Sequence, residues 1–238
     1  MNRTIQIAVV MLAVGCSGGA TVSLSARGWP STSSAASANP NALTLSNGIV
    51  INRVRVVISD VKLETAAAAA TLDADAGVAA TSAGAEVDGE DEIHTGPVVL
   101  DLSGAALDGT VQTVVESSLT PGTYSEIRFK IHKVTASESS DAALKAMSDA
   151  GASIIVDGTI DGAAFSFVSS IEAQQKFEGS FTLAANNNLT VNVDETNWFG
   201  SATARLDPRV EANRSQIENN IKASFRAFRD NDRDGHDD

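Results

Sequence analysis

The strongest constraint on the fold is a period-two alternation of apolar and charged residues in two segments of the chain. In the first segment, Val54, Val56 and Ile58 alternate with Arg53 and Arg55. In the second segment, Tyr124 to Val134, one face would carry the apolar residues Ile127, Phe129 and Ile131. The other face would carry Arg128, Lys130 and His132. Successive side chains of a strand point to opposite faces of a sheet, so both segments are predicted to be half-buried strands.

Shorter apolar segments separated by turn residues predict further strands. They lie at residues 97–102, 111–119, 153–156, 163–168, 179–183 and 189–193. Pro121-Gly122 is a strong turn signal, and the segment before it is either a strand or an irregular turn. Asp161-Gly162 and Asn186 to Asn188 are predicted to close hairpins.

Two helices are expected beside these strands. Residues 139–150 contain good helix formers and end at Gly151, which fits one short surface helix. Asp207-Pro208 is a typical helix start, and it opens a predicted C-terminal amphipathic helix over residues 207–229. Its apolar stripe consists of Ile217, Ile221, Phe225 and Phe228. Because the strands do not alternate regularly with helices, the predicted fold is mainly β, an antiparallel β-sandwich.

The N-terminus has the outline of a signal peptide. Arg3 precedes an apolar run at residues 5–14, which is too short for a bilayer-spanning helix of about 20 residues. Ala13-Val14-Gly15-Cys16 is similar to the lipobox of bacterial lipoproteins, in which the cysteine thiol is acylated. We therefore predict a lipoprotein signal peptide at residues 1–15 and lipidation of Cys16. A plain cleaved signal peptide and a cytoplasmic protein with an apolar start are the alternatives.

Cys16 is the only cysteine of the chain, so it can form neither an internal disulfide nor a thiolate metal site. A processed lipoprotein carries two or three acyl chains, which hold a protein firmly in a membrane at about 0.8 kcal/mol per buried CH₂. Ser17 follows Cys16 where an inner-membrane retention signal would usually place Asp. The membrane is thus a partner through the lipid anchor, and the expected location is the outer membrane of the cell envelope.

Composition divides the rest of the chain. Residues 16–47 are rich in Ser, Ala, Gly, Asn and Pro, and are predicted to be a flexible tether. Residues 48–206 form the predicted sandwich domain. It is interrupted at 65–95 by a low-complexity, Ala-rich acidic segment that contains no Lys or Arg between Glu64 and Glu92. We expect that segment to be an insertion loop.

The formal net charge of −13 argues against nucleic acid as a partner, because phosphates require clustered Lys and Arg. The same charge is compatible with binding of divalent cations. A protein or glycan partner is not identified by any residue pattern.

The acidic tail at residues 230–238 has the spacing of a calcium loop. Asp230, Asp232 and Asp234 alternate and are followed by Gly235, so three carboxylates could converge on one ion while glycine permits the sharp turn. The ligand that such loops place at their twelfth position would have to come from Asp237, Asp238 or the terminal carboxylate. The affinity expected of such a site is about 10⁻⁴ to 10⁻³ M. A solvated, frayed tail is the alternative, and calcium is the only cofactor that the residue pattern suggests.

No catalytic constellation is predicted. The histidines, at positions 94, 132 and 236, lack the spacing of a metal-binding pair on one element. Ser59 and Lys62 match the Ser-x-x-Lys pattern of serine acyl-enzymes, but on a strand rather than at the start of a helix, so the match is interpreted as chance. The chain is expected not to be an enzyme.

Three segments resemble a known family. They are INRVRVVISDVKL at 51–63, GPVVLDL at 96–102 and LTPGTYSEIRFKI at 119–131. Together they are similar to the bacterial and archaeal lipoprotein group called domain of unknown function 4382. The resemblance covers residues 40–135 best, and it implies a small sandwich of the transthyretin, prealbumin or Ig-like kind. Its motifs are packing and turn motifs and carry over no functional residue.

Taken together, these features predict a non-enzymatic, surface-displayed bacterial lipoprotein with a binding or structural role in the envelope. The alternative is a calcium-binding module built on the loop at Asp230.

Overall fold

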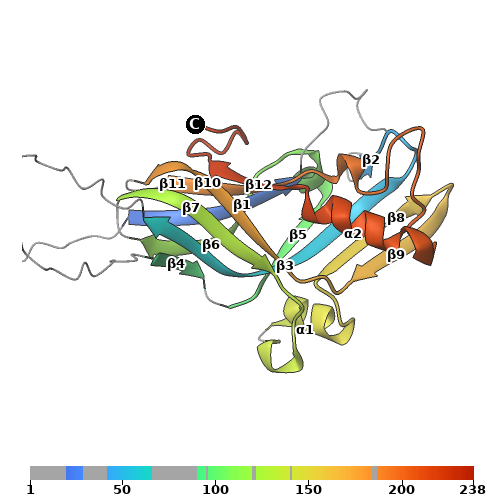
Figure 1. The fold of residues 1–238 in the computed structure, drawn as a ribbon, viewed down its shortest axis with the longest axis horizontal. Helices are drawn as coiled ribbons and strands as arrows, with labels where there is room; N and C mark the ends of the chain where they lie inside the picture. Colours follow the sequence, from blue (N-terminus) through green and yellow to red (C-terminus); the bar gives the residue numbers. More distant parts are fainter. Residues whose placement is uncertain are drawn as a thin grey trace, which may run out of the picture.

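The computed structural model describes residues 20–28, 42–65, 90–94, 96–119, 122–139, 141–183 and 187–238. The predicted signal peptide, Cys16 and most of the acidic segment, residues 66–89, lie outside these ranges. The described chain is mainly β and forms two mostly antiparallel sheets, so the predicted fold class is confirmed at this level (Figure 1). No described helix is long and apolar enough to cross a membrane.

The first sheet has four strands in the order β12-β11-β1-β6, and the second has eight, built around the path β10-β7-β3-β8-β9. The bounds of the first sheet are β1 Ala20–Gly28, β6 Gln112–Leu119, β11 Asn187–Val193 and β12 Phe225–Arg229. Those of the second are β2 Leu43–Thr44, β3 Val50–Thr65, β4 Glu90–His94, β5 Val98–Ser103, β7 Gly122–Ile131, β8 Ile154–Ile160, β9 Ala163–Ser169 and β10 Ala173–Leu183.

The 16-residue strand β3 is the spine of the larger sheet. One edge of β3 pairs first with β8, up to Val56, and then with β7 from Ile58 onward. Its other edge pairs in turn with β2, β5 and β4. The predicted alternation is confirmed, because Val54, Val56 and Ile58 are fully buried. One long strand therefore joins two half-sheets into a single layer.

Strand β1 overturns part of the predicted tether. Residues 20–28 pair in parallel with β11 and antiparallel with β6, which places them inside the four-stranded sheet. Val22, Leu24 and Ala26 point into the core and are at most 1% exposed. The Ser/Ala-rich composition concealed this alternation, and sheet pairing satisfies the backbone that a tether would leave to water. The β1–β11 pair also departs from a purely antiparallel sandwich.

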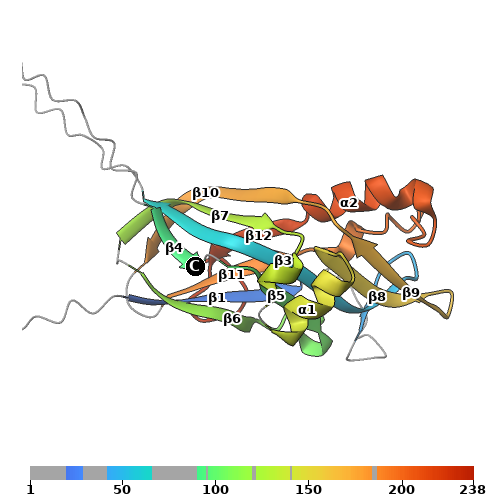
Figure 2. The same cartoon turned by 90° about the horizontal axis from the view of Figure 1, so that it is seen from below.

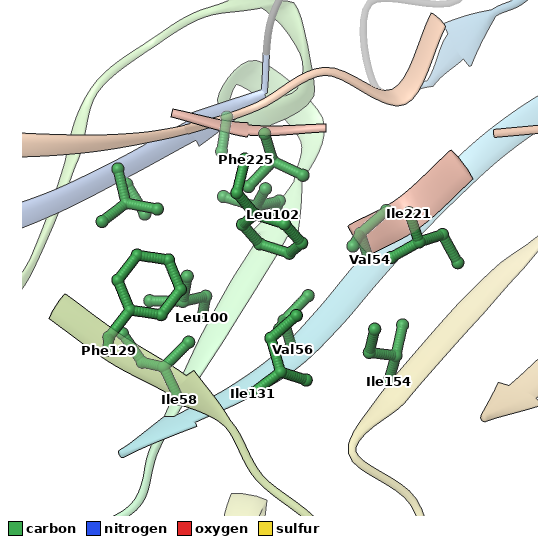
Figure 3. Packing of buried hydrophobic residues seen from close by; sticks show 14 of the residues in the cluster. Val54, Val56, Ile58, Leu100, Leu102, Phe129, Ile131, Ile154, Ile221 and Phe225 are labelled. Carbon is green, nitrogen blue, oxygen red and sulfur yellow. The ribbon is translucent and has the colours of Figure 1, made fainter. Parts of the chain in front are cut away.

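The two sheets enclose one hydrophobic core. Figure 2 shows β1 and β6 on one side of the molecule and β3, β7 and β10 on the other. Side chains from both sheets and from the C-terminal helix meet in that core (Figure 3). The rings of Phe129 on β7 and Phe225 on β12 lie edge to face, with centroids 6.0 Å apart. This contact joins the two sheets directly and supports a sandwich-like arrangement.

Helix α1, Ala142–Asp149, confirms the predicted short surface helix. Asp141 caps it by accepting a hydrogen bond from the Leu144 backbone N–H at 2.9 Å. Leu144 and Met147 are buried against Val57 on the outer face of the larger sheet. The helix therefore covers a small second core.

The predicted helix over residues 207–229 is correct only in its middle. After a short 3₁₀ turn at Glu211–Asn213, helix α2 spans Arg214–Lys222 and buries Ile217 and Ile221. Phe225–Arg229 is strand β12 instead, paired with β11. Phe225 and Phe228 fit helical spacing, but the open edge of β11 offers backbone partners that a longer helix would leave unused.

Two further predictions need correction. Asp161-Gly162 closes the β8–β9 hairpin as predicted, with both residues at positive φ. Asn187 and Asn188 do not form a hairpin turn, because they begin β11, which belongs to a different sheet from β10. Within the predicted acidic loop at 65–95, Glu90–His94 forms β4, which pairs with β3. Residues 90–94 form a strand because they extend the hydrogen-bonded ladder along the same edge of β3 that pairs with β5.

Candidate metal centre at the C-terminal tail

The C-terminal residues Asp230–Asp238, here called the tail, fold back over the outer face of the four-stranded sheet. The tail follows β12 and lies beside β11 and β12 in Figure 1. The backbone N–H of Asp230 donates to Asn188 O at 2.9 Å, and that of Asp238 donates to Arg229 O at 3.1 Å. The tail is therefore not frayed, because its backbone is bonded to β11 and β12, but seven of its nine residues are exposed to solvent.

A layer of buried polar side chains lies between the sheet and the tail. Because the apolar residues of β1 and β11 face the core, the residues between them face outward, and we call these the polar layer. Its members are Ser23, Ser25 and Arg27 of β1 and Asn188, Thr190 and Asn192 of β11, each at most 5% exposed. The carboxamide oxygen of Asn188 accepts hydrogen bonds from Ser23 Oγ at 2.9 Å and from Ser25 Oγ at 2.7 Å.

Asp230 joins the tail to the polar layer and is fully buried. Its Oδ2 accepts a hydrogen bond from Thr190 Oγ1 at 2.7 Å, and its Oδ1 accepts one from the Gly235 backbone N–H at 3.2 Å. The backbone oxygen of Asp230 accepts from Asn188 Nδ2 at 2.9 Å. The carboxylate is thus held in one orientation by the sheet on one side and the tail on the other.

The structure brings together the three predicted calcium ligands. One carboxylate oxygen from each of Asp230, Asp232 and Asp234 lies within 4.8 Å of the others, and Asp232 and Asp234 are exposed. Arg233 and Gly235 have φ of +59° and +85°, so the chain turns sharply twice around the cluster. The positive φ favours glycine at position 235, and a Cβ there would also displace the guanidinium of Arg27.

Arg27 supplies a positive charge beside this cluster. Its Nε donates to Asn192 Oδ1 at 3.1 Å, and its Nη2 donates to Gly235 O. Burial lowers the pKa of the Arg27 guanidinium below its ordinary value, and the carboxylates of Asp230 and Asp234 oppose that shift. Arg27 therefore acts as a built-in counter-ion for part of the carboxylate cluster.

The proposed replacements for the missing twelfth ligand are not gathered in the cluster. Asp238 Oδ2 accepts a hydrogen bond from the Asn231 backbone N–H at 2.5 Å, and Asp237 lines a neighbouring groove. That groove, of about 490 Å³, lies between the tail, β10 and β12 and is also bordered by Lys176 and Arg226. The donor set within the described residues is therefore three carboxylates, which fits a weak oxygen-ligand cation site and not a closed one.

Sequence reasoning missed Arg27 and the rest of the polar layer. The signal was present in residues 21–27, where Val22, Leu24 and Ala26 alternate with polar neighbours. The same alternation occurs in residues 187–193. Lipidation of Cys16 lies outside the described residues. His132 lies at the surface as predicted, with its Nε2 2.9 Å from Glu138 Oε1.

No family model matches the chain, and no curated protein and no solved structure matches it significantly.

Proposed function

We propose that this chain is a non-enzymatic lipoprotein of the bacterial cell envelope, held in the outer membrane by acyl chains on Cys16. The observation that carries the proposal is Ala13-Val14-Gly15-Cys16 directly behind the apolar run at residues 5–14. Ser17, in place of an Asp, favours the outer membrane. The lipid would hold the domain at the membrane, and the domain would serve in binding or in envelope structure.

Metabolic labelling with an alkyne fatty acid tests the lipid. The full-length protein, expressed in a double-membraned bacterium, is expected to incorporate the label and to partition into the detergent phase, whereas Cys16→Ser does neither. Ser17→Asp serves as the matched variant: it should keep the label but move the protein to the inner-membrane fraction. An unlabelled full-length protein that partitions into the aqueous phase would reject the proposal.

Calcium binding by Asp230, Asp232 and Asp234 is the second candidate function. It is favoured by three carboxylate oxygens held within 4.8 Å of one another around a two-turn loop. Calcium should shift the amide signals of residues 230–235 with a dissociation constant of about 10⁻⁴ to 10⁻³ M, and the double variant Asp232→Asn/Asp234→Asn should lose that response. Unchanged amide signals at about 5 mM calcium would rule the candidate out.

We also propose that the chain shares the fold of the domain of unknown function 4382 group. The resemblance of residues 51–63, 96–102 and 119–131 to the domain of unknown function 4382 group, and the mostly antiparallel two-sheet arrangement, support a sandwich of the transthyretin or Ig-like kind. An experimental structure of any member of that group tests it: strand order and the position of the spine strand should match those of this chain.

A further inference from the structure

We infer that one end of the sandwich lies directly against the bilayer, with no spacer between the lipid and the folded domain. This inference rests on the proposed lipidation of Cys16. It concerns the end at which β1 begins, here called the proximal end, and the partner is the phospholipid headgroup surface.

Strand β1 belongs to the folded domain from its first residue. Ala20 already pairs with Leu119 of β6, and Val22 pairs with both Ser117 and Asn187. The strand lies between two partners and its core-facing side chains, Val22 and Leu24, are fully buried. The chain is therefore fixed to the domain from Ala20 onward.

The connection between Cys16 and β1 is short. Four peptide steps separate Cys16 from Ala20, and a fully extended chain covers at most about 3.6 Å per residue, or about 14 Å in all. Acyl chains on Cys16 would place that residue at the headgroup level. The start of β1 then lies within about 14 Å of the bilayer surface, whatever path residues 17–19 take.

This connection brings the ends of several strands to the membrane. The ends of β6, β7, β10 and β3 lie beside the start of β1, because Ala20 pairs with Leu119, Gly122 with Leu183, and Tyr124 with Thr65. The left side of Figure 1 shows these strand ends together. Thr65 and Glu90, the described residues on either side of positions 66–89, also lie at this end.

Exposed hydroxyl side chains lie at the strand ends. They are Thr21, Ser118, Thr123 and Thr182, and the hydroxyls of Thr123 and Thr182 are 3.3 Å apart. Acidic residues belong to the same end: the side chain of Glu64 is 40% exposed, and the sequence between Thr65 and Glu90 contains further Asp and Glu. Hydroxyls can donate hydrogen bonds to phosphate and glycerol oxygens, whereas an anionic leaflet would repel the carboxylates. The contact with headgroups is therefore enforced by the short connection to the lipid and not by charge.

The opposite, distal end also carries charged pairs and lies far away. It contains the β8–β9 turn, where Asp161 pairs with Arg205, and the neighbouring Asp207–Arg209 pair. The 16 residues of β3 run along most of the sandwich, which at about 3.3 Å per residue is about 50 Å. An envelope partner would therefore meet the distal end or the sides of the domain.

Energy transfer to the membrane tests this orientation. Cys16 is the only cysteine and would be consumed by lipid, so Ser118→Cys and Ala163→Cys each introduce a unique thiol, at the proximal and distal ends respectively. The lipidated full-length variants are labelled with a donor fluorophore and reconstituted into phosphatidylethanolamine/phosphatidylglycerol vesicles that contain an acceptor lipid. Transfer is expected to be several-fold more efficient from position 118 than from position 163.

A spacer variant makes the result specific. Inserting a 20-residue Gly/Ser linker between Gly19 and Ala20 should lower transfer from position 118 toward that from position 163, because the domain is then free to leave the surface. Equal transfer from both positions in the unmodified protein, with the protein still floating with the vesicles, would overturn this inference alone. Failure to float with the vesicles would overturn the proposed lipidation as well.

Discussion

At the scale of single residues, Arg27 lies between the four-stranded sheet and the tail and bonds to both. Its guanidinium contacts Asn192 and Gly235 and faces the carboxylates of Asp230 and Asp234. Removing one member of a buried charged group leaves the others uncompensated. Arg27→Ala should therefore lower the free energy of unfolding by about 3 kcal/mol, measured by urea denaturation.

Arg226 is the matched control for this prediction. It pairs across the sheet with Asn192, as Arg27 does from the other side, but it is exposed. Arg226→Ala should change stability by less than about 0.5 kcal/mol. Equal effects of the two substitutions would contradict the counter-ion role of Arg27.

Asp207 gives a prediction about pH. Its hydrogen bonds from Arg209 lower its pKa from 3.8 to about 2. A carboxyl whose pKa is lower in the folded state stabilises the fold above about pH 4, and that contribution is lost as pH falls toward 2. Because the pair is at the surface and only two residues apart in sequence, the loss should stay below about 1 kcal/mol.

A carbon NMR titration of the Asp207 carboxyl measures this shift directly. Arg209→Gln should return the pKa toward 3.8, whereas Arg214→Gln, which removes a charge that pairs with Glu211, should leave it at about 2. A pKa that stays low in Arg209→Gln would assign the shift to another group.

At the scale of elements, β1 marks where the folded domain begins, because Ala20–Gly28 is a strand and not part of a tether. Leu24→Asp places a charge in the core position of a central strand, and should unfold the protein or cost more than about 4 kcal/mol. Thr21→Asp, on an exposed side chain of the same strand, should change stability by less than about 0.5 kcal/mol. Thermal denaturation of a soluble variant that starts at residue 17 compares them, and similar melting temperatures would restore the tether interpretation.

The elements that sequence predicted well are those whose pattern has one interpretation. β3 and β7 alternate over long segments with bulky residues, and α1 has a clear Gly151 stop. The region at Phe225 was ambiguous, because two phenylalanines three residues apart fit a helix and only the open edge of β11 favours a strand. Asn187 and Asn188 are typical turn residues, and their place in a strand depends on long-range partners such as Ser23 and Ser25.

The candidate metal centre was predictable in part, because some of its residues are close in sequence and others are not. The spacing of Asp230, Asp232 and Asp234 is local, so sequence alone placed the three carboxylates together. Arg27 comes from a strand more than 200 residues earlier in the chain, and no local pattern could connect it to Gly235. Burial of Asp230 likewise depends on Thr190, a tertiary contact.

At the scale of the whole molecule, the two ends of the described chain close one sheet. β1 pairs with β11 at a sequence separation of about 165 residues, and β11 in turn pairs with β12. Bringing together two strands so far apart in sequence costs chain entropy before their contacts form. We therefore expect slow folding that needs nearly the whole chain. β1 can pair with β6 earlier, but its second partner, β11, becomes available only when residues 187–193 are present.

The main core, to which both sheets contribute, predicts that this folding is cooperative. Trp198 is fully buried in the cluster that contains Leu24 of one sheet and Ile58 of the other, so its fluorescence reports on the packing that joins the sheets. In a Trp29→Phe variant, Trp198 is the only tryptophan. Its fluorescence and the far-ultraviolet circular dichroism should change at the same guanidinium concentration, because neither sheet keeps a buried face without the other. Two separate transitions would mean that the eight-stranded sheet, with α1 covering part of its outer face, is stable without β1, β6, β11 and β12. The core would then be divided at the contact between Phe129 and Phe225, where β7 meets β12.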